Sequence, residues 1–199
     1  MTKRYDREYF DHWYRGSNRI ATEAEVRRKV TMAVSIAEFF LRRPIRSVLD
    51  VGCGEALWRA PMIALRPALA YQGVDPSEYV VRRYGRRRGI RLGSFGALGA
   101  LRLGRAYDLI ICADVLHYVA AAEVRAGLAE VAARLGGVAY LPVVTSSDDV
   151  EGDVRGLVRR PQAWHRARFR EAGLVPIGLE CYVRRDALDG LTALERWQA

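Results

Sequence analysis

Two carboxylates and a pair of glycines are the groups in this sequence whose spacing suits chemistry best. Asp50 lies near the end of an apolar, β-branched run at residues 46–51, and Gly52 and Gly54 come just after this run. Such a run predicts a buried parallel strand that turns sharply into a helix. In open α/β sheets ligands bind beyond the carboxyl ends of the strands, where glycines let the backbone approach them closely. The stretch therefore predicts a ligand site that includes Cys53 as well.

The glycine spacing differs from that of a nicotinamide dinucleotide site. That fingerprint has three glycines spaced G-x-G-x-x-G, and Leu57 stands where the third would be. An ionised Asp50 would also repel a pyrophosphate bound at the start of the helix. A carboxylate at this point suits a cationic ligand instead.

A second acid, Asp75, ends a shorter apolar strand predicted at residues 70–75. It lies one strand–helix–strand unit beyond Asp50. A carboxylate at the tip of such a strand can accept hydrogen bonds from both hydroxyls of a ribose. Pro76 and Ser77 begin the next helix.

A further apolar run, at residues 107–112, predicts a strand that ends at Cys112. Asp114, His117 and Tyr118 follow it. Because parallel strands end at the same edge of a sheet, these side chains should lie beside the two earlier acids. His117 is the candidate general base, since histidine titrates near neutrality, and Tyr118 is a candidate for positioning a substrate. A histidine that packs the helix start or lines the pocket is the alternative.

The pattern apolar-apolar-Asp-apolar-Gly-x-Gly at residues 48–54, together with the later strand ends, resembles the class I S-adenosylmethionine-dependent methyltransferases. Their cofactor carries a sulfonium and an ammonium. The resemblance covers residues 46–184 and implies an α/β fold: a doubly wound, Rossmann-like, seven-stranded sheet with helices on both faces and a reversed last strand. The cofactor-binding residues that it implies are Asp50, Gly52, Cys53, Gly54, Asp75, Pro76, Ser94, Phe95, Cys112 and Asp114.

The strand predicted at residues 90–95 departs from the family pattern. Members of the family commonly place an acid or polar residue there to meet the adenine amine, whereas this chain has Ser94 and Phe95. The resemblance implies that the adenine lies beside Pro76, Ser94 and Phe95, where a backbone amide could take the place of the acid.

The N-terminal segment, residues 1–43, predicts two helices. Five aromatic residues at helical spacing gather on one face of the first, at residues 3–15. This face either staples the helix onto the domain or forms a lid over the cofactor, with Tyr14 or Arg15 reaching the bound molecule. The second helix, at residues 22–41, begins with a capping box.

The rest of the chain alternates between helical and strand patterns, which predicts a single domain over residues 1–199. The remaining predicted elements are helices at 55–66, 121–135, 161–172 and 187–197, and strands at 136–143, 174–179 and 180–184. Pro61 predicts that the first of these helices starts late or kinks. The polar segment 145–160 is either a mobile loop on the substrate side or a solvated loop without a role.

Composition limits the functional classes. The formal charge is +9, but of the 32 basic residues only Lys3 and Lys29 are lysine. An arginine bias of this kind is expected of a compositionally biased coding sequence, although a basic surface also permits a nucleic-acid partner. Three scattered cysteines and three histidines predict neither a zinc site nor a disulfide framework. No apolar run reaches the roughly 20 residues that cross a bilayer, and no export signal is evident, so we expect a cytoplasmic protein.

The function that these features predict is methyl transfer from S-adenosylmethionine to a small-molecule acceptor, without a metal. Two alternatives remain: a methyltransferase directed at RNA, and a protein that binds S-adenosylmethionine without catalysis. Substrate selection should come from residues 1–20, the 145–160 loop and the turn after Asp114.

Overall fold

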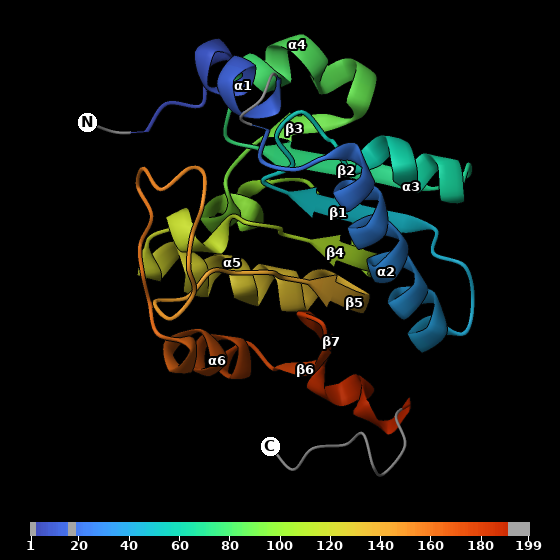
Figure 1. Cartoon of the computed structure of the whole chain (residues 1–199). Helices are drawn as coiled ribbons and strands as arrows, with labels where there is room; N and C mark the ends of the chain where they lie inside the picture. Colours follow the sequence, from blue (N-terminus) through green and yellow to red (C-terminus); the bar gives the residue numbers. More distant parts are fainter. Residues whose placement is uncertain (1–2, 16–18, 191–199) are drawn as a thin grey trace.

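Seven strands form one mixed sheet in the computed structural model, which describes residues 3–15 and 19–190 (Figure 1). The strands are β1 (Ser47–Val51), β2 (Ala70–Asp75), β3 (Ile90–Leu92), β4 (Tyr107–Ile111), β5 (Leu135–Tyr140), β6 (Leu174–Gly178) and β7 (Cys181–Arg184). Their order is β3-β2-β1-β4-β5-β7-β6, and β7 runs antiparallel to both of its neighbours. This topology confirms the predicted doubly wound sheet with a reversed last strand.

Helices lie on both faces of the sheet (Figure 1). They are α1 (Arg7–Tyr14), α2 (Glu23–Leu41), α3 (Arg59–Leu65), α4 (Glu78–Arg88), α5 (Ala121–Arg134) and α6 (Gln162–Glu171), with 3-10 segments at η1 (Phe95–Ala100), η2 (Leu116–Tyr118) and η3 (Arg185–Gly190). Helix α2 packs on one face through Val30 and Val34, and α5 packs on the other through Val124 and Leu128. No helix in the described ranges is both long and apolar enough to span a bilayer.

The central strands are buried on both faces, which explains their continuous apolar sequences. Strand β1 pairs in parallel with β2 on one side and β4 on the other. Its successive residues alternate between the two cores, since Val48 packs in the cluster of α2 and Leu49 in the cluster of α5. In β4, Leu109 and Ile110 alternate in the same way, and all four side chains are fully buried.

Several element boundaries differ from the predictions. Helix α3 begins only at Arg59, which makes Pro61 its third residue, where a backbone amide would have no partner within the helix. The prediction of a late start is therefore confirmed. The strand predicted at 90–95 is wrong in its second half, because β3 ends at Leu92 and a 3-10 turn follows. The helix predicted at 187–197 begins as the 3-10 segment η3, and the rest of it lies outside the described residues.

The capping box predicted at the start of α2 is confirmed. The Thr22 hydroxyl accepts a hydrogen bond from the Glu25 amide at 3.2 Å, and the Glu25 carboxylate accepts one from the Thr22 amide at 2.7 Å. These reciprocal bonds satisfy two of the amides that a helix start leaves without partners. They fix where α2 begins against the sheet.

Gly127 of α5 allows a close approach between this helix and the turn after β3. A Cβ at this position would overlap the ring and the carbonyl oxygen of Phe95. Alanine favours a helix over glycine by about 1 kcal/mol, so Gly127→Ala would stabilise the protein if the space were open. We expect destabilisation instead, by about 1–3 kcal/mol, because overpacking exceeds the gain in propensity. Chemical denaturation of the parent protein and the variant measures the change in the free energy of unfolding.

The control for Gly127→Ala is the same change in a Phe95→Leu background, where a smaller side chain faces the helix. The penalty there should be smaller than in the parent protein. An equal penalty in both backgrounds would show that the Phe95 ring is not the obstacle.

Candidate functional site

The turn after β1 depends on two glycines in the left-handed region, with φ of 71° at Gly52 and 51° at Gly54. Other residue types rarely adopt this conformation. A Cβ on Gly52 would overlap the side chain of Val115, and one on Gly54 would overlap the hydroxyl of Tyr14. The Gly52 amide also donates to the Val74 carbonyl at 2.7 Å, which ties the turn to the neighbouring strand.

Asp75, at the end of β2, hydrogen-bonds to this turn. One carboxylate oxygen accepts from the Gly54 amide at 2.7 Å, and the other accepts from the Ser77 amide at 2.9 Å. The side chain is buried, and burial raises its pKa although the two amides act in the opposite direction. Each oxygen keeps a second lone pair, so Asp75 can accept further hydrogen bonds from a ligand.

Asp50, the single acid of β1, is 2% exposed. It accepts a hydrogen bond from the Tyr71 hydroxyl at 2.6 Å. Burial raises the pKa of Asp50 to about 7, and the charge of Asp75 adds to this effect while the Tyr71 hydrogen bond opposes it. A cation beside Asp50 would therefore relieve an unfavourable charge.

A cavity of about 910 Å³ lies over these acids and glycines, at the carboxyl edge of the sheet. The predicted site residues that line it are Asp50, Gly52, Cys53, Gly54, Asp75, Pro76, Ser94, Phe95, Asp114, His117 and Tyr118. Of the predicted cofactor residues, Cys112 is the exception, since it is fully buried in the core and is not part of the lining. The structure thus brings three separate strand ends to one cavity.

Phe95 contributes less to the cavity than its position suggests. The residue is 3% exposed, and its ring packs in the core against Gly127 of α5. Ser94 precedes η1 and its side chain makes no capping hydrogen bond to this segment. A ligand at this end of the cavity would meet Ser94 and the backbone more than an open aromatic face.

The cavity is acidic, although the whole chain is basic. Its acidic lining residues are Asp50, Asp75, Asp114, Glu123, Glu151 and Asp153. The basic lining residues are Arg19 and Lys29, and the Lys29 ammonium lies 3.9 Å from Asp114. Surrounding carboxylates concentrate cations and repel phosphates. The lining of the cavity therefore favours cations, although the whole chain carries a net positive charge.

His117 is buried at the wall of the cavity, and its protonation is set by the backbone. The Val144 amide donates to His117 Nδ1 at 3.3 Å, so in the neutral ring the proton lies on Nε2. Burial lowers the pKa of His117, which favours this neutral form. His117 can thus donate a hydrogen bond from Nε2. Its neighbour Tyr118 packs against the ring at 4.4 Å.

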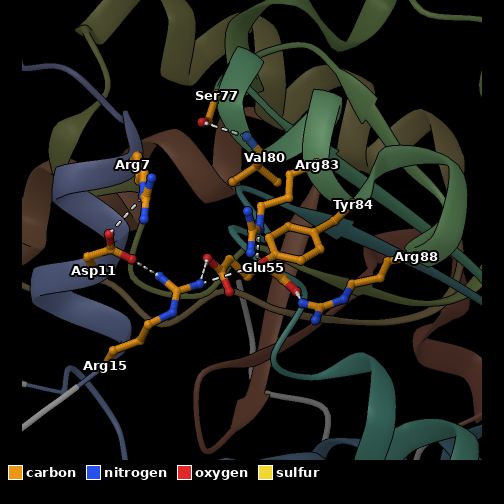
Figure 2. A network of polar contacts seen from close by, with 9 residues as sticks. All are labelled: Arg7, Asp11, Arg15, Glu55, Ser77, Val80, Arg83, Tyr84 and Arg88. Atoms are coloured by element: carbon orange, nitrogen blue, oxygen red, sulfur yellow. Dashed lines mark hydrogen bonds and ion pairs between the residues drawn. The ribbon is translucent and has the colours of Figure 1, made fainter.

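Helix α1 covers the glycine turn. The Phe10 side chain is buried, and the Tyr14 hydroxyl reaches Gly54. Figure 2 shows that Arg15 lies between α1 and the turn: its guanidinium contacts Asp11 at 2.6 Å and Glu55 at 2.5 Å. The predicted aromatic helix is therefore present, and it rests directly on the predicted ligand turn.

Helix α4 closes the same network from the other side (Figure 2). The Tyr84 hydroxyl accepts hydrogen bonds from Arg15 at 3.2 Å and from Arg83 at 2.9 Å. The Arg88 guanidinium donates to the carbonyl of Glu55. Arg83 and Arg88 of α4 thus help to hold the turn and α1 in place.

Sequence reasoning did not single out Tyr71, Glu55 or the Lys3–Asp153 ion pair as site features. Tyr71 could have been found from the periodicity of the strands. Residues two apart on a strand share a face, so Val48 lies on the same face as Asp50, and Tyr71 pairs with Val48 in the register. The contacts of Glu55 and Asp153 join segments far apart in the chain. No local spacing signals such contacts.

Comparisons with known proteins agree with this geometry. A family model described as a methyltransferase domain matches residues 6–193. Among curated proteins, no significant match was found. The sugar N-methyltransferase KedS8 from Streptoalloteichus has a TM-score of 0.62 and 21% identity, over 92% of this chain and 94% of that one.

Two further solved structures share the fold. The amino pentose methyltransferase CalS10 from Micromonospora echinaspora has a TM-score of 0.60 and 18% identity, over 84% of this chain and 98% of that one. The magnesium protoporphyrin IX methyltransferase ChlM from Synechocystis has a TM-score of 0.57 and 19% identity, over 90% of this chain and 93% of that one. Because the family model covers most of the sequence, the chain belongs to the methyltransferase domain family and, as its motifs predicted, is a class I S-adenosylmethionine-dependent methyltransferase.

Proposed function

We propose that this chain transfers the methyl group of S-adenosylmethionine to a small-molecule acceptor inside the 910 Å³ cavity. The observation that supports the proposal most is the presence of two buried acids, Asp50 and Asp75, beside a glycine turn in an acid-lined cavity. A sulfonium cofactor with an ammonium and a ribose needs this combination of charge and hydrogen-bond acceptors.

The cofactor is assigned to residues by the chemistry of each group. Asp75 keeps lone pairs for the ribose hydroxyls, and Asp50 supplies negative charge for the amino-acid end. Gly52 and Gly54 give the turn its left-handed backbone, and a Cβ at either position would overlap Val115 or Tyr14. We place the adenine toward Ser94, where the backbone stands in for the usual acid. These residues fit S-adenosylmethionine in charge and in polarity.

When bound, S-adenosylmethionine supplies a methyl group on a sulfonium that is already reactive. The protein then contributes mainly by alignment and by excluding water, and proximity alone can account for much of the barrier reduction. Helix α1 and the 145–160 loop supply the outer lining through residues such as Trp13 and Gly152. His117 is suited to hold an acceptor by donating from Nε2. Because Val144 occupies Nδ1, this role suits the geometry better than that of a general base.

A small molecule suits this cavity better than RNA. Phosphates would be repelled by its acidic lining. The arginine-rich helix α4 does not contribute any residue to that lining. Two of the similar structures are named as a sugar N-methyltransferase and an amino pentose methyltransferase, which also supports a small acceptor.

The ribose assignment predicts the effect of Asp75→Asn. An asparagine keeps one acceptor oxygen but turns an NH₂ group toward a backbone amide and removes the charge. We expect S-adenosylmethionine to bind about 10- to 100-fold more weakly, as is typical when a charged hydrogen-bond acceptor is lost. Isothermal titration calorimetry measures this. Asp186→Asn, an exposed acid outside the cavity, is the control. Unchanged affinity in a folded Asp75→Asn variant would contradict the assignment.

The raised pKa of Asp50, about 7, predicts that cofactor binding depends on pH. A cationic ligand favours the ionised carboxylate, so binding is strong above this pKa and is lost as the pH falls through it. The dissociation constant should be about tenfold larger at pH 6 than at pH 8. Asp50→Asn has the same shape but cannot ionise, so its affinity should be weaker and nearly constant over that range. Equal pH profiles for both proteins would rule out Asp50 as the titrating group.

A further inference from the structure

The ammonium of Lys3 lies inside a cage of three tyrosine rings. Its Nζ atom is 3.6 Å from the ring centre of Tyr118, 5.2 Å from that of Tyr5 and 5.4 Å from that of Tyr9. It also contacts a carboxylate oxygen of Asp153 at 2.5 Å. The Lys3 and Asp153 side chains are only 11% and 8% exposed. A lysine near the chain terminus is thus held in a closed, cation-binding environment.

The walls of this cage come from three separate segments. Tyr5 precedes α1 and Tyr9 lies within it, and their rings meet edge to face at 5.0 Å. Tyr118 comes from the turn after β4 and donates a hydrogen bond from its hydroxyl to the Asp153 carbonyl at 2.5 Å. These residues therefore contact one another in two pairs, Tyr5 with Tyr9 and Tyr118 with Asp153, besides their contacts to Lys3. We call these four residues, Tyr5, Tyr9, Tyr118 and Asp153, the tyrosine cage.

A cage of this composition is chemically selective. Aromatic faces attract a cation through their quadrupole, and aromatic cages recognise ammonium groups in particular. A buried carboxylate adds the opposite charge. All four residues of the tyrosine cage line the same cavity as Asp50 and Asp75. A ligand in that cavity can reach the cage.

Burial of the Lys3 ammonium in the tyrosine cage is unfavourable. Burial lowers its pKa although Asp153 acts to raise it, so its charged form is less favourable in the cage than in water. A cation that belongs to a ligand could take its place, because Lys3 can return its ammonium to solvent on a flexible stem.

We infer that the tyrosine cage is a binding subsite for an alkylammonium group of the acceptor, and that Lys3 occupies it until the acceptor enters. An ammonium has no lone pair, so the cage binds the acceptor and does not activate it. This inference rests on the proposed function. It adds a substrate class to that function, namely small molecules that carry an amine. Its binding chemistry can be tested without any turnover.

The test uses the whole chain with Lys3→Ala, in which the cage loses its internal ammonium. Tetramethylammonium is the probe, and tert-butanol, a neutral molecule of similar shape, is its control. We expect Lys3→Ala to bind tetramethylammonium at least about tenfold more tightly than the parent protein, because its cage no longer holds an internal ammonium that competes with the probe for the aromatic faces. It should gain no affinity for tert-butanol. Calorimetry or ligand-observed NMR measures both.

Matched variants locate the site of binding. Arg28→Ala removes an exposed cation of α2 that does not line the cavity, and it should leave tetramethylammonium affinity unchanged. Adding Tyr118→Leu or Asp153→Asn to Lys3→Ala should abolish the gain. If Lys3→Ala is unstable, Lys3→Gln removes the same charge and serves the same purpose.

The outcomes separate this inference from the proposed function. If neither Lys3 variant gains affinity for tetramethylammonium, the inference is overturned and the ion pair with Asp153 is only structural. Titration with S-adenosylmethionine is run on the same samples. A gain for tetramethylammonium without cofactor binding would leave the cage in place and refute the proposed function, whereas cofactor binding without the gain would do the reverse.

Discussion

The carboxylate of Asp75 is the constraint on which the rest of the site depends. It binds the Gly54 amide with one oxygen and the Ser77 amide with the other, so it joins the turn after β1 to the start of α4. The turn then presents Glu55 to Arg15 of the N-terminal segment. A single buried acid at the tip of β2 thereby fixes the ligand turn, helix α4 and the helix that covers them both.

The charge of the cavity lining differs in sign from the net charge of the chain. The protein carries +9 overall, yet the cavity is lined by more acids than bases. Arginines of α4 point instead to the outer network around Tyr84 and Glu55. Buried carboxylates without cations are unfavourable, as the raised pKa of Asp50 indicates. Binding of a cation relieves this strain, so the electrostatic preference of the site differs from what net charge alone would indicate.

Local patterns predicted most of the fold, and most of the site residues that they predicted line the cavity. The apolar run before Asp50 and the one before Asp114 predicted central strands, because buried parallel strands need such sequences on both faces. Patterns could not tell which way a side chain faces at a strand end, so Phe95 turned out to pack in the core and Cys112 to lie outside the lining. Nor could they reveal the meeting of Lys3 with Asp153, since that contact depends on how the whole chain closes.

The N-terminal segment contacts both the glycine turn and the tyrosine cage. At the end of α1, Tyr14 and Arg15 contact the glycine turn, while Tyr5 and Tyr9 near its start form part of the tyrosine cage. Because one short helix contacts both places, a ligand that shifts it at one end changes its contacts at the other. Thermodynamic linkage makes such coupling reciprocal. If an acceptor ammonium that displaces Lys3 changes the affinity for the cofactor through α1, a bound cofactor must change the affinity for the acceptor by the same factor.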